Sequence, residues 1–198
     1  MSFVYVGLGN PGEEYEGTRH NTGRIVLDVF RKAIKLDDWG LDKKLNALVS
    51  SGKAGKASVT LLCPETFMNK SGNAVKGLII SAKKANELVV IHDDLDLPLG
   101  RFKMSFGKHS GGHRGVESIM KQIKTIEFIR VRVGISAAAT KGVVKKPVGE
   151  KAVGDFILGK FKDKELLVLK KVSKSIAEML TALPEYGLEK TMSLFGGR

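Results

Sequence analysis

The sequence predicts a single α/β domain. Strand-like and helix-like segments alternate along the 198 residues, which is the pattern of α/β proteins. That length is typical of one domain that buries its own core. No linker, low-complexity run or repeat of about 20–50 residues interrupts the pattern. We therefore expect residues 1–198 to fold as one unit.

The predicted strands are rich in apolar residues and are bounded by turn residues. The first, residues 3–8, has the composition of a buried strand. Gly52, Lys53, Ala54 and Gly55 provide a turn between two later strands. The expected strands are residues 3–8, 45–51, 58–63, 88–92, 101–105 and 128–135.

The predicted helices carry apolar side chains at helical spacing. Residues 22–36 and residues 72–83 both show this repeat. Residues 113–123 form a third helix. Residues 163–180 form a long amphipathic helix with Asp163 as its expected N-cap.

Composition limits the compartment and the class of partner. The one cysteine, Cys63, excludes an internal disulfide and favours the reducing cytoplasm. No apolar segment approaches the roughly 20 residues of a membrane helix, and no secretory leader is evident. Lys and Arg number 33 against 21 Asp and Glu, and the net charge of +12 favours a polyanion such as nucleic acid. A merely soluble basic protein is the alternative. Nothing in the sequence demands a second copy, so we expect a monomer without a membrane partner.

The glycines that follow the first strand fit two interpretations. Gly7, Gly9 and Gly12 match the G-x-G-x-x-G pattern of dinucleotide sites. In that pattern a helix begins directly at the glycines and an acid follows about 20 residues later. Here Pro11 and ten further residues precede the helical repeat, and Asp28 lies inside the helix. Turn glycines are the simpler interpretation, and a dinucleotide-dependent oxidoreductase is a minor alternative.

His20 is the expected general base. Its imidazole titrates near neutrality, so it can take a proton from water at cellular pH. Asn10 and Asn21 supply amides suited to peptide carbonyls or an oxyanion. A surface histidine in a loop is the alternative. Cys63 is a weaker nucleophile candidate, because it ends an apolar strand and suits the core.

Two polar segments follow later strands. In residues 63–72, Asn69 either binds substrate or caps the next helix. Phe67 and Met68 look exposed and would offer an apolar platform, or else they anchor the core.

In residues 91–98, His92, Asp93, Asp94 and Asp96 suggest a metal site. Neighbours on a strand point to opposite faces, however, so they cannot all meet one ion. We prefer Asp93 as a single carboxylate that orients a histidine, with no metal.

A glycine-containing loop, residues 108–115, precedes the helix at 113–123 and suits anions. Basic side chains lie on or beside it and would contact phosphates, or else they form a solvated face. The expected phosphate contacts are Lys103, Lys108, Arg130 and Arg132.

Together these segments resemble the bacterial-type peptidyl-tRNA hydrolase family, in the family's order and over nearly the whole chain. The matching segments are residues 7–12, 15, 18–21, 66–69, 71–72, 92–98, 110–113, 128–135 and 153–161. The resemblance implies a twisted mixed β-sheet flanked by helices. It implies hydrolysis of the ester between tRNA and a peptide or N-blocked aminoacyl group, which recycles tRNA without a cofactor.

The resemblance also implies residue roles. His20 matches the base, Asp93 the acid that orients it, and Asn10 the residue that separates blocked from free aminoacyl-tRNA. Residues 145–161 match a gate over the cleft. Residues 137–147 are rich in Ala, Lys and Gly, so we expect a mobile loop there, and residues 137–161 together form a loop and gate segment. Lys103 and Arg132 match contacts to tRNA phosphates. The expected substrate-binding residues are Tyr15, Phe67, Met68, Asn69, His113 and Arg114.

Arg114 departs from the family, which usually has Asn there. Arg cannot accept a hydrogen bond, so it would bind a phosphate or a peptide carbonyl instead. Ser105 stands where some relatives carry lysine, and Lys108 would compensate. A non-catalytic RNA-binding protein on the same scaffold is the alternative, although intact His20 and Asp93 favour an enzyme.

Overall fold

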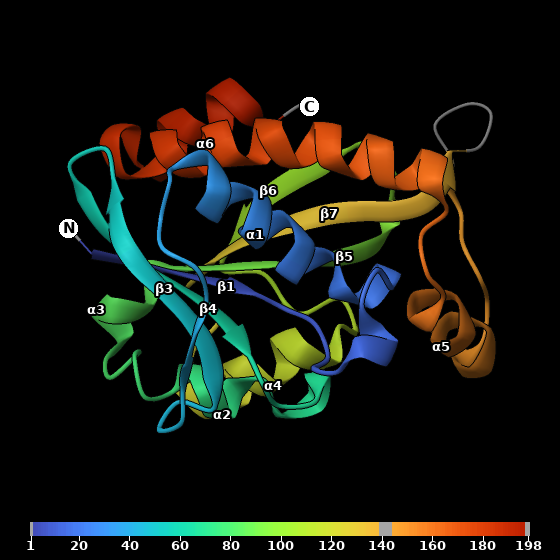
Figure 1. The fold of residues 1–198 in the computed structure, drawn as a ribbon, viewed down its shortest axis with the longest axis horizontal. Helices are drawn as coiled ribbons and strands as arrows, with labels where there is room; N and C mark the ends of the chain where they lie inside the picture. The colour runs from blue at the N-terminus through green and yellow to red at the C-terminus, as the bar shows by residue number, and fades with distance from the viewer. Residues whose placement is uncertain (1, 139–143, 197–198) are drawn as a thin grey trace.

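The computed structural model describes residues 2–138 and 144–196, and it contains one mixed sheet between two helical layers (Figure 1). The strands are β1 Ser2–Gly7, β2 Gly40–Asp42, β3 Ala47–Ala54, β4 Ala57–Pro64, β5 Leu88–Pro98, β6 Phe102–Phe106, β7 Ile129–Ala138 and β8 Val144–Lys145. Their order is β2-β3-β4-β1-β5-β7-β6, and β8 pairs with β7. The central strands β4, β1, β5 and β7 are parallel, and the outer pairings are antiparallel. The predicted α/β class is confirmed.

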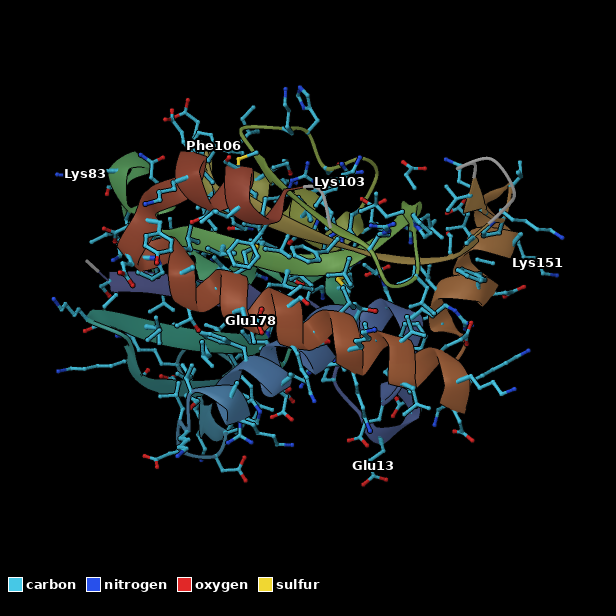
Figure 2. The ribbon with its side chains drawn as sticks, turned by 90° about the horizontal axis from the view of Figure 1, so that it is seen from above. Glu13, Lys83, Lys103, Phe106, Lys151 and Glu178 are labelled. Carbon is cyan, nitrogen blue, oxygen red and sulfur yellow. The ribbon has the colours of Figure 1, made fainter. Side chains whose placement is uncertain are left out.

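Helices cover both faces of the sheet (Figure 1). The α-helices are α1 Thr22–Ala33, α2 Gly72–Val75, α3 Ala82–Ala85, α4 Arg114–Ile123, α5 Glu150–Leu158 and α6 Asp163–Phe195. Because successive strand residues face opposite sides, Tyr5 of β1 packs with α1 and α6 while Val6 packs with α2 and α4. Figure 2 looks down onto α6, which crosses the molecule above this first core. Short 3-10 turns η1 Glu13–Tyr15, η2 Arg19–Asn21 and η3 Met68–Lys70 connect strands to helices.

The structure corrects several predicted boundaries. The helix expected at residues 72–83 is divided into α2 and α3, because Gly77 weakens helix propagation and Ser81 caps a new turn by accepting from Lys84 N. Lys162, not Asp163, is the N-cap of α6. Strand β2 and helix α5 were not predicted.

The loop expected at residues 137–147 is partly wrong. Its ends, residues 137–138 and 144–145, pair as strands β7 and β8. Residues 139–143 lie outside the described residues. No helix in the described part of the chain has the length and apolarity needed to cross a bilayer.

The N-terminal glycines bring α1 directly against the sheet. A Cβ at Gly7 would lie 2.5 Å from the carbonyl oxygen of Gly23. A Cβ at Gly23 would lie 2.4 Å from Leu8 N and 2.3 Å from the carbonyl oxygen of Ile91. Neither position has room for a side chain. The glycines therefore serve close helix–sheet packing, which fixes η2 beside the C-terminal end of β5.

Candidate active site

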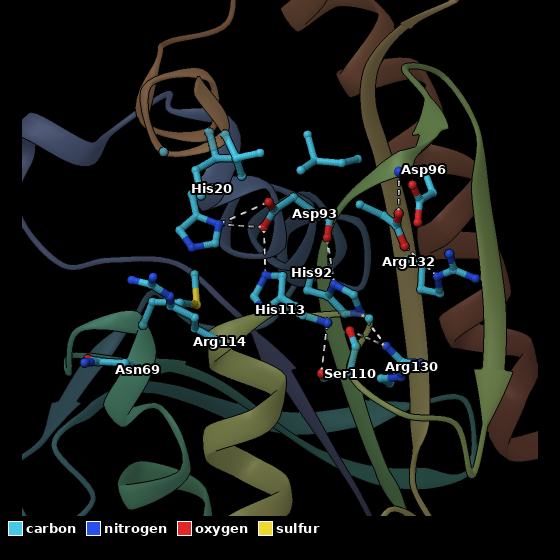
Figure 3. A pocket seen from close by; sticks show the side chains of 18 of the residues that line it. His20, Asn69, His92, Asp93, Asp96, Ser110, His113, Arg114, Arg130 and Arg132 are labelled. Atoms are coloured by element: carbon cyan, nitrogen blue, oxygen red, sulfur yellow. Dashed lines mark hydrogen bonds and ion pairs between the residues drawn. The ribbon is translucent and has the colours of Figure 1, made fainter. Parts of the chain in front are cut away.

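An open cleft of about 1170 Å³ lies at the C-terminal end of β5, between α4, α5 and η3 (Figure 3). This is the usual place for a site in a largely parallel sheet. The structure brings most of the predicted site residues to it. Those lining it are Asn10, His20, Phe67, Met68, Asn69, Asp93, Lys108, His113, Arg114, Arg130 and Arg132. Tyr15 and Lys103 do not line it.

Two histidines share one buried carboxylate at the base of the cleft (Figure 3). The Nδ1 atom of His20 lies 3.0 Å and 3.1 Å from the two carboxylate oxygens of Asp93. The Nε2 atom of His113 lies 3.0 Å from Oδ1 of the same carboxylate. Asp93 is only 5% exposed, so these hydrogen bonds form in a poorly solvated environment. His20 and Asp93 meet as predicted, and His113 joins them.

Hydrogen-bond partners assign the histidine tautomers. A carboxylate only accepts, so His20 donates from Nδ1 and its Nε2 carries a lone pair. Nε2 has no hydrogen-bond partner among the described residues. The backbone N–H of Val116 donates to Nδ1 of His113 over 3.4 Å, so His113 donates to Asp93 from Nε2. The lone pair on His20 Nε2 is therefore available to take a proton.

The electrostatics of the site stabilise the imidazolium that forms when His20 takes a proton. Burial alone would lower the pKa of His20, but the charge of Asp93 and its hydrogen bond outweigh burial and raise that pKa above its ordinary value. Burial alone would raise the pKa of Asp93, but His20 and His113 hold it well below the ordinary range of a carboxyl. Asp93 is thus an ionised carboxylate that stabilises an imidazolium at His20.

Asn10 presents a donor to the cleft. Its Oδ1 accepts from Met68 N over 2.8 Å, which leaves its amide NH₂ for a substrate oxygen. Asn21 was expected to offer substrate a second amide, and this is wrong. Its Oδ1 accepts from Asn10 N over 2.8 Å and its Nδ2 donates to Asn10 O over 3.0 Å. Asn21 therefore positions Asn10.

Phe67 is exposed as expected, but Met68 is not. Phe67 is 57% exposed and packs edge-on against Tyr15, with ring centroids 6.4 Å apart. Tyr15 therefore reaches the rim of the cleft through Phe67. Met68 is buried, because it packs into the core beside Gly115. Asn69 is exposed and lines the cleft.

The basic residues divide into two groups. Lys108 is exposed at the cleft, and Arg132 is half-buried there, with its Nε donating to Asp94 over 2.5 Å. Lys103 on β6 is exposed and pairs in register with Arg132. Arg130 differs, because it is buried and donates to backbone carbonyls. The expectation that Arg130 presents itself to tRNA phosphate is not supported by this placement.

Helix α5 forms the far wall of the cleft, and charged groups connect it to the site at both ends. Arg114 at the start of α4 donates to Glu150 at the start of α5 over 2.6 Å. Lys146 forms an ion pair with Asp96. At the other end, Arg19 donates hydrogen bonds to the carbonyl oxygens of Gly159 and Lys160, over 3.2 and 2.9 Å respectively.

Arg19 also forms a two-pronged ion pair with Glu165 of α6, at 3.0 and 2.9 Å. Its guanidinium packs over the rings of Phe156 and Phe161. Sequence analysis missed this anchor, although Arg19 directly precedes His20. It also missed Glu150 and Lys146, for which no local pattern exists.

His20, Asp93 and His113 have ligand atoms within 4.8 Å of one another. Two imidazoles and a carboxylate are a donor set that suits a transition metal. Here the same atoms satisfy each other, because both imidazoles donate protons to the carboxylate. Side chains arranged in this way are suited to acid–base chemistry.

Known proteins resemble this chain over nearly its full length. A family model described as peptidyl-tRNA hydrolase matches residues 4–198. A peptidyl-tRNA hydrolase of Persephonella marina is 37% identical over 195 residues, which cover 98% of this chain and 97% of the relative. One from Aquifex aeolicus is 39% identical over 190 residues, or 96% and 93% of the two chains.

The fold agrees with this similarity. The crystal structure of peptidyl-tRNA hydrolase from Acinetobacter baumannii has a TM-score of 0.84 to this structure at 28% identity, covering 98% of this chain and 94% of that chain. The matches in sequence and in fold both span the strands, helices and loops that form the cleft. The chain belongs to the peptidyl-tRNA hydrolase family.

Proposed function

We propose that this protein hydrolyses the ester bond between tRNA and a peptide or N-blocked aminoacyl group, and so returns free tRNA to translation. One observation carries the proposal: His20 lies at an open cleft with no partner for its Nε2 among the residues that the structure describes, while its Nδ1 is held by the buried carboxylate of Asp93. A ring fixed in this tautomer is suited to take a proton from water.

The mechanism follows from the positions of these groups. His20 Nε2 removes a proton from water as the water oxygen attacks the ester carbonyl carbon. The Asn10 amide donates to an oxygen of the substrate and Asn69 binds the peptide backbone. The bond from the carbonyl carbon to the ribose oxygen then breaks, and that oxygen takes the proton back from the imidazolium. The products are the peptide acid and tRNA with a free hydroxyl, and the His20–Asp93 pair is restored. No cofactor is required.

The tRNA would lie on the basic side of the cleft. Lys103, Lys108 and Arg132 would contact phosphates of the acceptor stem while the 3′ end enters the cleft, since Lys108 and Arg132 line the cleft and Lys103 pairs in register with Arg132. Residues 145–161 would act as a gate, since α5 forms one wall of the cleft and exposed ion pairs of Glu150 and Lys146 connect this segment to the site. A monomer acting in the cytoplasm completes the proposal.

A single assay tests this function. We expect the wild-type protein to release a labelled peptide or N-acetyl-aminoacyl group from tRNA, in buffer with or without a chelator. A protein that binds this tRNA and releases nothing would support the RNA-binding alternative. Loss of release on adding chelator would contradict chemistry by side chains alone.

A further inference from the structure

Arg130 is a buried cation. It is 5% exposed and lies on β7 beside the cleft. None of the ion pairs formed within residues 2–138 and 144–196 includes it. Burial lowers the pKa of its guanidinium and the charge of Arg132 lowers it further. The charge of Asp94 raises this pKa but does not restore it to the ordinary value. A buried charge is costly unless its donors are satisfied, so the groups that accept from Arg130 indicate what it does.

The acceptors on one side belong to the glycine-containing loop that precedes α4. Arg130 donates from Nη2 to the carbonyl of His109 over 2.7 Å and from Nη1 to that of Ser110 over 3.3 Å. Gly111 and Gly112 follow with φ of +66° and +83°, which side chains rarely adopt. Glycines give this loop little rigidity of its own, and the loop ends at His113. The planar guanidinium of Arg130 therefore fixes the position of a loop that is flexible by itself.

The third acceptor is His92, which is buried on β5. Its Nδ1 donates to the backbone carbonyl of Asp93 over 2.7 Å, so its Nε2 is left to accept. Nη1 of Arg130 lies 3.4 Å from that Nε2. Burial lowers the pKa of His92 well below its ordinary value, and the charge of His113 adds to this. His92 is thus a neutral spacer between Arg130 and Asp93.

Both routes end at the same carboxylate. His92 contacts the backbone of Asp93, and the clamped loop delivers His113 to its side chain. The rings of His92 and His113 also pack together, with centroids 4.6 Å apart (Figure 3). We propose that Arg130 is a positioning residue: it holds His92 and the glycine-containing loop before α4, so that His113 fixes Asp93 beside His20. The kinetic part of this inference rests on the proposed function.

The rival role is a contact to tRNA phosphate. That role needs the positive charge of Arg130, whereas positioning needs the forked geometry that reaches three acceptors at once. Lysine keeps the charge and loses the fork. Arg130→Lys therefore separates the two roles. Arg132 is a matched control, because it lies on the same strand and face but pairs with Asp94 at the cleft surface.

The kinetic experiment compares Arg130→Lys, Arg130→Gln and Arg132→Gln on N-acetyl-aminoacyl-tRNA. We expect both Arg130 variants to lose kcat by on the order of 10²-fold, as small misplacements of a catalytic group do, with KM and its salt dependence unchanged. Arg132→Gln should raise KM and weaken its salt dependence. Wild-type kcat in Arg130→Lys, or a salt-dependent rise in KM in Arg130→Gln, would overturn the proposal.

A spectroscopic experiment is independent of turnover. Long-range ¹H–¹⁵N spectra of the imidazoles should show His113 as the Nε2–H tautomer in the wild type and as a mixture in Arg130→Lys. Identical spectra in the two proteins would overturn the positioning role even if the protein hydrolyses no ester. If the wild type is inactive but the spectra differ as expected, the proposed function fails and the positioning role stands.

A milder variant covers a failure of Arg130→Lys to fold. Ser110 Oγ accepts from Gly112 N over 3.0 Å and donates to Glu117 over 3.0 Å, so Ser110→Ala loosens the loop without touching the buried cation. It should lower kcat by a smaller factor, leave KM unchanged and shift the His113 resonances. Wild-type kcat and spectra in this variant would contradict the proposal.

Discussion

His20 and His113 donate to the same oxygen of Asp93, each across 3.0 Å. Asp93 cannot rotate toward one ring without loosening its bond to the other. The carboxylate is thereby held in one orientation before substrate arrives. Such preorganisation lowers the cost of forming an imidazolium at His20 in the transition state.

Removing the imidazole of His20 should abolish most turnover and spare binding. His20→Ala is expected to lower kcat by about 10²–10⁴-fold, the usual contribution of a general base. The Kd for tRNA should be unchanged, because the phosphate contacts lie on other residues. Single-turnover hydrolysis and filter binding measure the two quantities. Retention of wild-type turnover would exclude His20 as the base.

The pH dependence should report the partnership of His20 and Asp93. In the wild type, kcat/KM should rise with pH as the imidazole loses its proton, at a pH above the ordinary histidine pKa because Asp93 raises it. Asp93→Asn removes that cause and leaves burial, which lowers the pKa. The acid limb should therefore move to lower pH while the plateau rate falls. Rate profiles from about pH 5 to 9 test this, and an unmoved limb would refute the pairing.

Lys108 should contribute to salt-dependent binding of tRNA. Lys108→Gln is expected to reduce the slope of log K against log salt by about 0.7–0.9, the value for one phosphate contact. The rate at saturating substrate should not change. Lys83 is an exposed lysine of α3, far from the α5 end that carries Lys151 (Figure 2), so Lys83→Gln is a control that should leave the slope unaltered. Equal slopes for the wild type and Lys108→Gln would remove Lys108 from the tRNA surface.

Glu150 should compete with substrate for Arg114. Both side chains are largely exposed, at 87% and 68%, so breaking their ion pair should leave the melting temperature unchanged. Glu150→Gln frees the Arg114 guanidinium for a substrate phosphate, and KM should fall with kcat unaltered. In an Arg114→Gln background the same change should have no effect on KM. An equal effect in both backgrounds would show that Glu150 acts without Arg114.

A methyl group at Gly23 should separate α1 from the sheet. Gly23→Ala places Cβ within 2.4 Å of backbone atoms of Leu8 and Ile91, and overpacking of this kind costs about 1–3 kcal/mol. Denaturant unfolding should show this loss, and kcat should fall because η2 moves with α1. Gly154→Ala is the control, since nothing lies within 4 Å of the added Cβ in α5. It should leave the protein as stable as before or more so.

Local patterns accounted for most of the fold. The buried strands and helix α1 were predicted because their periodicity depends on neighbours in sequence. The break between α2 and α3 was not, because Val75 and Ile79 keep helical spacing across a turn that Gly77 and Ser81 impose. Helix α5 has no buried residue. A helix that is not buried against the core is harder to predict from an apolar pattern, and α5 was not predicted.

The site was predictable where residue chemistry was enough. His20 and Asp93 are 73 residues apart yet were expected together, because a base needs an orienting acid near a strand end. Side chains alternate between the two faces of β7, so Arg130 and Arg132 were expected on one face of the strand. This alternation does not reveal that the loop before α4 covers Arg130 and leaves Arg132 at the cleft surface. The contacts of Glu150 and Asn21 likewise depend on the tertiary path of the chain.

The bond between Arg19 and Glu165 spans 146 positions of sequence and ends one residue from His20. The last helix is therefore not a dispensable tail. A shortened chain lacking α6 would lose the ion pair that holds Arg19, the residue before the base, as well as a helix that covers the sheet. A ligand that binds along α6, remote from the ester, could therefore shift His20 through Glu165 and Arg19.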